Sequence, residues 1–308
     1  MNAPAPPRAQ LPALDWELDF YSRPILEADG RKRWELLICS SATARGVGEP
    51  QAGQAATPRD FRWQRPCPAD SVNSIWLRQA IEDALDEARE QGWPRPRRLR
   101  CWRGSMRTMV QRAAEGVGLE LVPSRRCYAL VEWLQERQRN VYPLEEGFQS
   151  GPLAPPPQPI RSVAVPLPEA LRGDAWDWAT LEAGALAEAA SWEIGFAGLL
   201  PLPGSLGPET PVPGIRLFSR SRALAIAGWL AGLEPVRLEI DDNRLILEAG
   251  LEDRWLLANL ASEEAAAAAQ AFATARDSAW GLQFIAVVAS PTAERLEGFW
   301  LLRDLPDG

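Results

Sequence analysis

Arginine and aromatic side chains are interleaved through residues 97–143, and these residue types can hold the phosphates and bases of RNA. The segment contains ten arginines against four glutamates, in a protein whose formal net charge is −8. Guanidinium groups pair with phosphate oxygens, and each aromatic ring stacked on a base of a single strand contributes about 1–3 kcal/mol. Binding depends on a local basic face and not on the charge of the whole chain. We therefore interpret the segment as a nucleic-acid-facing surface.

Three short stretches place serine and arginine at the predicted start of a helix, where an anion can bind. They are the turn at Gly104-Ser105, residues 123–126 (PSRR) and residues 219–222 (SRSR). Serine can cap such a helix, and the free backbone N–H groups attract phosphate. The alternative is that these arginines lie on solvated helix faces or pair with the acids of the chain, and Trp102 and Trp133 are expected in the core. The predicted RNA-binding residues are Arg100, Arg103, Arg107, Arg125, Arg126, Tyr128, Arg137, Arg139, Arg220 and Arg222.

Carboxylates in the first half allow a second chemistry, the metal-dependent cleavage of phosphodiesters. Asp19 on the first predicted strand and Glu82 or Asp86 on the first predicted helix could hold metal ions. Where a nuclease with a ribonuclease H-like fold has a further carboxylate, this chain has the sequence CWR at residues 101–103. We therefore predict no catalytic residue, and we interpret the acids at residues 239–248 as part of a polar hairpin.

The rest of the composition narrows the function further. Histidine is absent, which removes the commonest general base and the imidazole metal ligands. The four cysteines form no CxxC pair, so we expect reduced thiols and neither a metal nor a cofactor. The first residues lack the pattern of a signal or transit peptide, and no run approaches the ~18 apolar residues of a membrane span. These features predict a cytoplasmic protein without membrane insertion.

Hydrophobic periodicity predicts the elements that position these residues. Strands are expected at residues 14–22, 33–39 and 60–65, the first two joined by a turn at Asp29-Gly30. Helices are expected from residue 71 to about 92, at 106–114 and at 125–140, separated by strands at 99–102 and 119–122. The order β-β-β-α-β-α-β-α predicts a ribonuclease H-like mixed sheet in an α/β (α+β) protein.

Length and a Pro/Gly-rich stretch divide the chain into two domains. We predict a disordered tail at residues 1–13, the ribonuclease H-like domain at 14–143, a linker at 144–159 and a second α/β domain at 160–308. The second half carries 21 of the 41 acidic residues but 11 of the 33 basic ones. Its expected helices are residues 176–190, residues 221–231 and an alanine-rich helix from Ser262 to about 278, and its expected strands are residues 160–166, 214–218, 236–240, 244–248, 255–260, 282–289 and 298–302.

Six segments in a fixed order carry a family resemblance that covers nearly the whole chain. They are residues 16–26 (WELDFYSRPIL), 32–38 (KRWELLI), 123–126 (PSRR), 133–143 (WLQERQRNVYP), 219–233 (SRSRALAIAGWLAGL) and 298–306 (GFWLLRDLP). Together they resemble the chloroplast and cyanobacterial RNA-binding proteins required for synthesis of the photosystem I subunit PsaB, the Tab/Atab-like family.

The resemblance implies a non-enzymatic protein that binds single-stranded, A/U-rich leader RNA and promotes translation and biogenesis of photosystem proteins. Translation or assembly proteins are further implied partners. Because no transit peptide is seen, the expected form is cyanobacterial and cytoplasmic. Two alternatives stay open, a protein–protein assembly factor that does not bind RNA directly and a metal-dependent nuclease.

Overall fold

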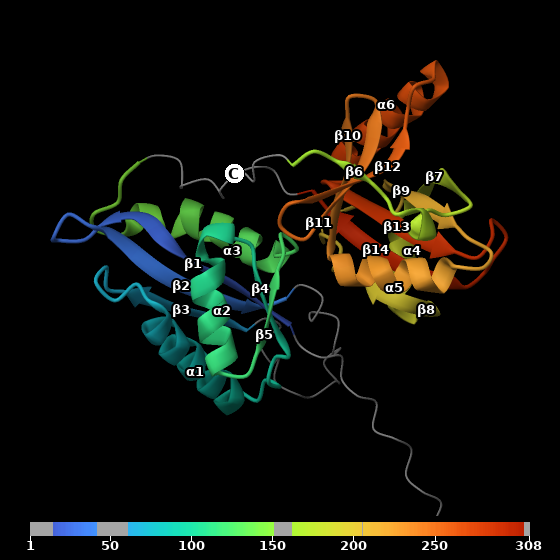
Figure 1. Ribbon diagram of the computed structural model, residues 1–308. Helices are drawn as coiled ribbons and strands as arrows, with labels where there is room; N and C mark the ends of the chain where they lie inside the picture. The colour runs from blue at the N-terminus through green and yellow to red at the C-terminus, as the bar shows by residue number, and fades with distance from the viewer. Residues whose placement is uncertain (1–14, 42–60, 151–161, 205, 305–308) are drawn as a thin grey trace, which may run out of the picture.

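The computed structural model describes residues 15–41, 61–150, 162–204 and 206–304. The predicted tail at residues 1–13 lies outside this part of the chain. Figure 1 shows the described residues as two α/β units side by side, with the N-terminal half in blue and green and the C-terminal half in yellow to red.

The first unit is built on a five-stranded sheet. Its strands are β1 (Asp15–Leu26), β2 (Lys32–Ser40), β3 (Arg62–Cys67), β4 (Arg98–Cys101) and β5 (Glu120–Pro123), in the order β3-β2-β1-β4-β5. The first three strands are antiparallel, and β4 and β5 run parallel to β1. This is the ribonuclease H-like arrangement, so the fold class predicted from the sequence is confirmed.

Helices cover both faces of this sheet (Figure 1). Trp16, Leu18 and Phe20 of β1 point to one face and form a core with α1 (Ser74–Glu90) and α2 (Arg107–Gly116). Asn73 begins α1, because its side chain accepts the N–H groups of residues 75 and 76. The opposite face packs against α3 (Tyr128–Asn140). On that face β1 carries three buried carboxylates, Asp15, Glu17 and Asp19.

The C-terminal unit contains two further sheets. The larger one consists of β7 (Ala175–Glu182), β8 (Ile194–Gly198), β9 (Pro211–Phe218), β13 (Leu282–Val288) and β14 (Leu296–Arg303), in the order β7-β9-β13-β14-β8. It packs against α5 (Ala223–Leu233) and α6 (Glu263–Ser278). The smaller sheet joins β10 (Pro235–Asp241), β11 (Arg244–Ala249), β12 (Asp253–Asn259) and β6 (Val165–Pro166). Ser262 caps α6 as predicted, by accepting the N–H of Ala265.

The helix predicted at residues 176–190 is wrong. Residues 175–182 form β7, paired along its length with β9, and the short helix α4 (Ala183–Ala187) follows. Trp176, Trp178 and Thr180 alternate along the strand, and residues of these types favour a pleated surface over a helix. The alanines that follow supplied the helical pattern. Strand β8, only five residues long, was not predicted.

One hydrophobic cluster contains residues of both units. Leu130 and Trp133 of α3 lie in the same cluster as Phe284 and Phe299 of the C-terminal sheet. Residues 144–150 of the predicted linker pack on β1, where Gly147 accepts the N–H of Leu26. The remainder of the predicted linker up to residue 159 lies outside the described residues.

Candidate nucleic-acid interface

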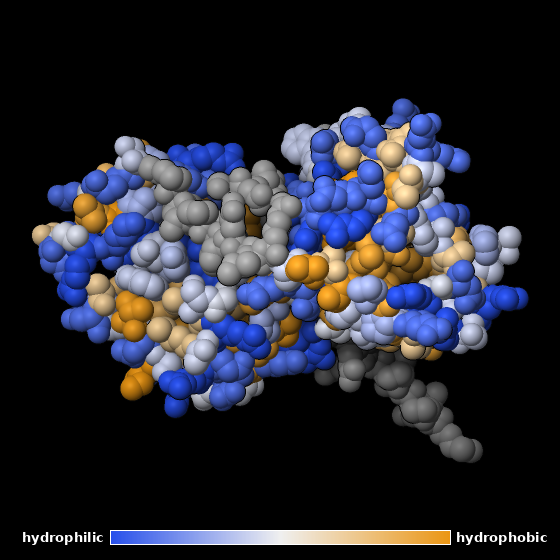
Figure 2. Space-filling view, turned by 45° about the horizontal axis from the view of Figure 1, so that its top comes forward, coloured by the Kyte–Doolittle hydropathy of each residue, from blue (hydrophilic) through white to orange (hydrophobic). Residues whose placement is uncertain are grey.

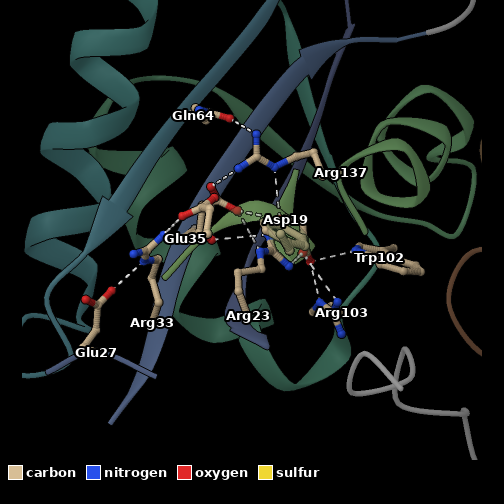
Figure 3. A network of polar contacts seen from close by, with 11 residues as sticks. Asp19, Arg23, Glu27, Arg33, Glu35, Gln64, Trp102, Arg103 and Arg137 are labelled. Carbon is tan, nitrogen blue, oxygen red and sulfur yellow. Dashed lines mark hydrogen bonds and ion pairs between the residues drawn. The ribbon is translucent and has the colours of Figure 1, made fainter. Parts of the chain in front are cut away.

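Asp19 lies at the centre of the sheet and is surrounded by arginines (Figure 3). Its carboxylate accepts from Nη1 of Arg23 at 2.8 Å, from the indole N–H of Trp102 at 2.8 Å and from Nε of Arg103. Arg103 lies between the rings of Trp102 and Tyr21, 4.8 and 4.1 Å from their centroids. Burial raises the pKa of Asp19, but the charges of Arg103 and Arg23 outweigh it and lower the pKa below its usual value.

Asp15, at the start of β1, meets two arginines of β4. Arg98 donates to it at 3.1 and 2.6 Å, and Nη1 of Arg100 lies 3.0 Å from it. Arg100 also donates to Glu234, the residue that follows α5, at 2.7 and 3.0 Å. Glu234 also accepts from the hydroxyl of Ser124 at 3.3 Å. Thus Arg100 bridges carboxylates from both halves of the chain.

Glu17 occupies the start of α3, where the sequence predicted a phosphate. Its carboxylate accepts the backbone N–H of Leu130 at 2.8 Å, in the first turn of the helix. Ser124 does not cap the helix as predicted, because α3 begins only at Tyr128 and the Ser124 hydroxyl accepts the N–H of Arg126 instead. The anion at this helix start is therefore a carboxylate of the protein itself.

Arg126 and Tyr128 join α3 to the C-terminal unit. Arg126 donates to the carbonyls of Pro235 and Gly198 at 2.9 and 2.6 Å, and it is only 4% exposed. The hydroxyl of Tyr128 donates to the carbonyl of Val236 at 3.0 Å. Both side chains were predicted on an RNA-facing surface and instead lie inside the junction.

Arg137 is also buried, on the α3 face of the sheet (Figure 3). It donates to Glu35 of β2 at 2.6 Å and to the hydroxyl of Tyr142 at 3.1 Å. Arg125 is half-buried, and its guanidinium lies 2.9 Å from Glu248 of β11. Burial raises the pKa of Glu248, but the charges of Arg125 and Arg237 lower it to about 2.

The surface placement predicted for Arg100, Arg103, Arg126, Tyr128 and Arg137 is therefore corrected. One physical reason covers most of the set: alternate residues of β1 and β2 put carboxylates on a covered face, and each buried charge requires a partner. The partners are arginines of β1, of β4 and the turn after it, and of α3. Trp133 is buried as expected.

Four predicted residues remain accessible. Arg107 and Arg139 are exposed at the start of α2 and the end of α3, and Arg220 is exposed at the turn before α5. Arg222 is half-buried, and it donates to the carbonyls of Glu169 and Arg172. Helix α5 begins at Ala223 without a side-chain cap, so the serine-capped helix start predicted within residues 219–222 is wrong.

Two further exposed arginines that the prediction left out lie on or beside α2. Arg112 is exposed on α2, and Arg95 donates to the carbonyl of Val117, the residue that follows α2. We call Arg95, Arg107 and Arg112 the α2 strip. Within the described residues, none of the three makes an ion pair. Figure 2 shows hydrophilic and hydrophobic side chains interspersed on the N-terminal half in its view.

The carboxylates considered for a metal site do not converge. Asp19 is held by arginines inside the sheet, whereas Glu82 and Asp86 pair on α1 with Arg78 and Arg89. No group of three or more His, Cys, Asp or Glu residues in the described ranges could hold a metal ion. The four cysteines are buried.

The fold and these contacts define a class of protein: a two-domain protein on a ribonuclease H-like scaffold whose central carboxylate is neutralised by arginines. The comparisons make this more specific. Residues 15–137 match the family model described as "RNA-binding protein Tab2/Atab2 N terminal", and residues 154–303 match "RNA-binding protein Tab2/Atab2, C-terminal domain". The chain belongs to the Tab2/Atab2 family of RNA-binding proteins, and the family predicted from the sequence is confirmed.

Two relatives are similar over nearly the whole chain. "Protein TAB2 homolog, chloroplastic" of Zea mays is 38% identical over 303 residues, which is 95% of this chain and 72% of the maize protein. The protein of the same name in Arabidopsis thaliana is 33% identical over 310 residues, 95% of this chain and 75% of the relative.

These names overturn the predicted location. Both relatives are named chloroplastic, which contradicts the expectation of a cytoplasmic protein. In the part of the chain that the structure describes, no helix is long and apolar enough to cross a membrane.

Proposed function

We propose that this protein binds single-stranded, A/U-rich leader RNA and thereby promotes the synthesis of photosystem proteins, without catalysing a reaction. Membership in a family of RNA-binding proteins supports RNA as the ligand. The resemblance of the six sequence segments supports the photosystem role. Translation or assembly proteins would be the further partners.

The observation that carries the proposed site is the α2 strip. Arg107 and Arg112 are exposed on a single helix, and Arg95 extends the strip to the end of that helix. An exposed guanidinium without a carboxylate partner can pair with a phosphate without first breaking an ion pair. Arg139 and Arg220 are secondary candidates on other elements, whereas Arg100, Arg103, Arg126 and Arg137 serve the scaffold.

The test is filter binding of a labelled A/U-rich leader RNA to the wild type and to Arg107→Glu/Arg112→Glu, at several salt concentrations. The affinity should fall by about tenfold or more at low salt, because two phosphate contacts become repulsive. The slope of log affinity against log salt should shrink by about 1.4, since each contact with a single strand contributes about 0.7.

The matched control is Arg31→Glu/Arg89→Glu, which changes the net charge equally. Both arginines are exposed and pair with a neighbouring acid, Asp29 or Asp86. This control should bind RNA nearly as well as the wild type. Equal loss in both double variants would argue against the α2 strip, and a wild type that retains no RNA at low salt would overturn the RNA-binding function.

A further inference from the structure

Among the described residues, strand β8 forms an open edge of the larger C-terminal sheet. It pairs with β14 on one side and stands last in the strand order (Figure 1). Its residues are Ile194, Gly195, Phe196, Ala197 and Gly198, and the middle three are exposed. Edge strands usually carry a charge, a proline or a bulge that prevents further pairing. β8 contains no charge and no proline, so its outer side can accept another strand.

Helix α5 extends this uncharged surface. All eleven of its residues are uncharged, in the sequence ALAIAGWLAGL. One side is buried against the sheet, whereas Leu224 on the other side is 56% exposed. Phe196 of β8 lies beside the helix, with its Cζ 3.4 Å from where a Cβ on Gly228 would stand. The exposed side of α5 and the edge of β8 therefore form one continuous apolar surface.

We propose that this surface is a homodimer interface, in which β8 pairs antiparallel with β8 of a second copy across a twofold axis at Phe196. The self-pairing is complementary in size. Counting outward from Phe196, Ile194 would stand opposite Gly198 of the second copy, and Gly195 opposite Ala197. Each larger side chain thus faces a small residue, and the two Phe196 rings form a cross-strand aromatic pair.

The spacing of the elements brings the helices into the same interface. α5 lies over β14 and β8 and also reaches β13. Neighbouring strands are about 4.8 Å apart, so pairing of the two β8 strands would place the two α5 axes roughly 10–14 Å apart. A helix with its side chains is about 10–12 Å wide. The exposed sides of the two helices would meet, and Leu224 would be covered.

The chemistry of the surface favours a second copy over RNA. Neither β8 nor α5 carries a cation that could recognise a phosphate. Isologous contacts across a twofold axis are the commonest interfaces of soluble oligomers, and they require a surface that is complementary to itself. Strand β8 meets this requirement, because Ile194 would face Gly198 of the second copy and the two Phe196 side chains would face each other. This interface is separate from the α2 strip, so its test needs no RNA.

The test is sedimentation equilibrium of the full chain over a range of micromolar concentrations. The wild type should have twice the 34.0 kDa mass of one chain. Phe196→Lys and Leu224→Lys should each shift the mass to that of a monomer, because a charge would be buried twice in the dimer. Ile75→Lys, at an apolar residue of α1 that is 81% exposed, is the matched control and should stay dimeric.

Two further measurements exclude trivial explanations. Circular dichroism at 25 °C should show that Leu224→Lys keeps the folded spectrum of the wild type, because the side chain is 56% exposed in one chain. Mild oxidation of Phe196→Cys should produce a disulfide-linked dimer, whereas Ile75→Cys should not. A wild type that stays monomeric at all concentrations, or a dimer that both lysine variants leave intact, would overturn the proposal.

Discussion

Arg100 of β4 and Glu234, which follows α5, form a bidentate ion pair that links the two halves of the chain. Nε and Nη2 of Arg100 donate to the two carboxylate oxygens at 2.7 and 3.0 Å. Both side chains are buried, and Glu234 has a left-handed backbone with φ of 57°. Arg100, one of the arginines that suggested a phosphate site, thus pairs with a carboxylate supplied by the other domain.

Replacing Glu234 by glutamine should destabilise the protein strongly. Without the charge of Glu234, Arg98 and Arg100 would share the single carboxylate of Asp15, and losing one partner of a buried ion pair costs up to about 3–5 kcal/mol. The melting temperature, followed by calorimetry at pH 7, should fall by several degrees. Glu252→Gln changes an exposed acid and should melt like the wild type. Equal melting of the two variants would show that the Arg100–Glu234 pair does not hold the halves together.

The stability should depend on pH through Glu248. Its pKa is lowered in the folded protein from 4.5 to about 2, so it stabilises the fold fully above pH 4.5 and loses this effect as the pH falls towards 2. Glu248→Gln should therefore be less stable than the wild type at pH 7, and the gap in melting temperature should narrow between about pH 4.5 and 2. A gap that is constant over this range would contradict the assignment.

Asp19→Asn tests whether the central carboxylate serves the scaffold or catalysis. Asparagine cannot neutralise Arg23 and Arg103, so the melting temperature should fall. RNA retained on a filter by the folded variant should match the wild type, because Asp19 is fully buried. Cleavage of RNA by the wild type in Mg²⁺ that disappears in Asp19→Asn would instead favour the nuclease alternative.

Tyr128→Phe tests whether Tyr128 stabilises the fold or stacks on a base of the RNA. Loss of the hydroxyl leaves the buried carbonyl of Val236 without this donor and should cost about 1–3 kcal/mol, seen in urea unfolding. RNA affinity should be unchanged, because the ring lies in the core shared by the two halves. Phenylalanine can also stack on a base, so Tyr128→Leu is the second variant, and loss of RNA affinity in folded Tyr128→Leu would restore Tyr128 as a contact.

The sequence alone determined most of the first domain. Local sequence patterns determine the type and order of the elements. Here these patterns are the alternation along β1 and β2, the Asp29-Gly30 turn and the helical spacing of α1. The same logic failed at residues 175–182, where pairing with β9 prevailed over a helical pattern that depended on the neighbouring alanines.

The sequence did not determine which arginines are exposed and which pair with buried carboxylates. A guanidinium on a predicted helix looks the same whether it faces solvent or a carboxylate from a distant strand. The partners here come from far along the chain, as between Arg100 and Glu234 or between Arg137 and Glu35. The sequence contained one signal of this pairing. Asp15, Glu17 and Asp19 alternate with apolar residues on β1, which is the central strand of the sheet.

Both faces of a central strand are covered by other parts of the protein. The carboxylates on its polar face must therefore pair with cationic side chains of the same protein. Only the tertiary structure decided which arginines do this and which are exposed. It buried Arg103 against the carboxylate of Asp19, and it buried Arg126 against backbone carbonyls of the C-terminal unit. It left Arg107 and Arg112 exposed because the apolar side of α2 packs on the sheet.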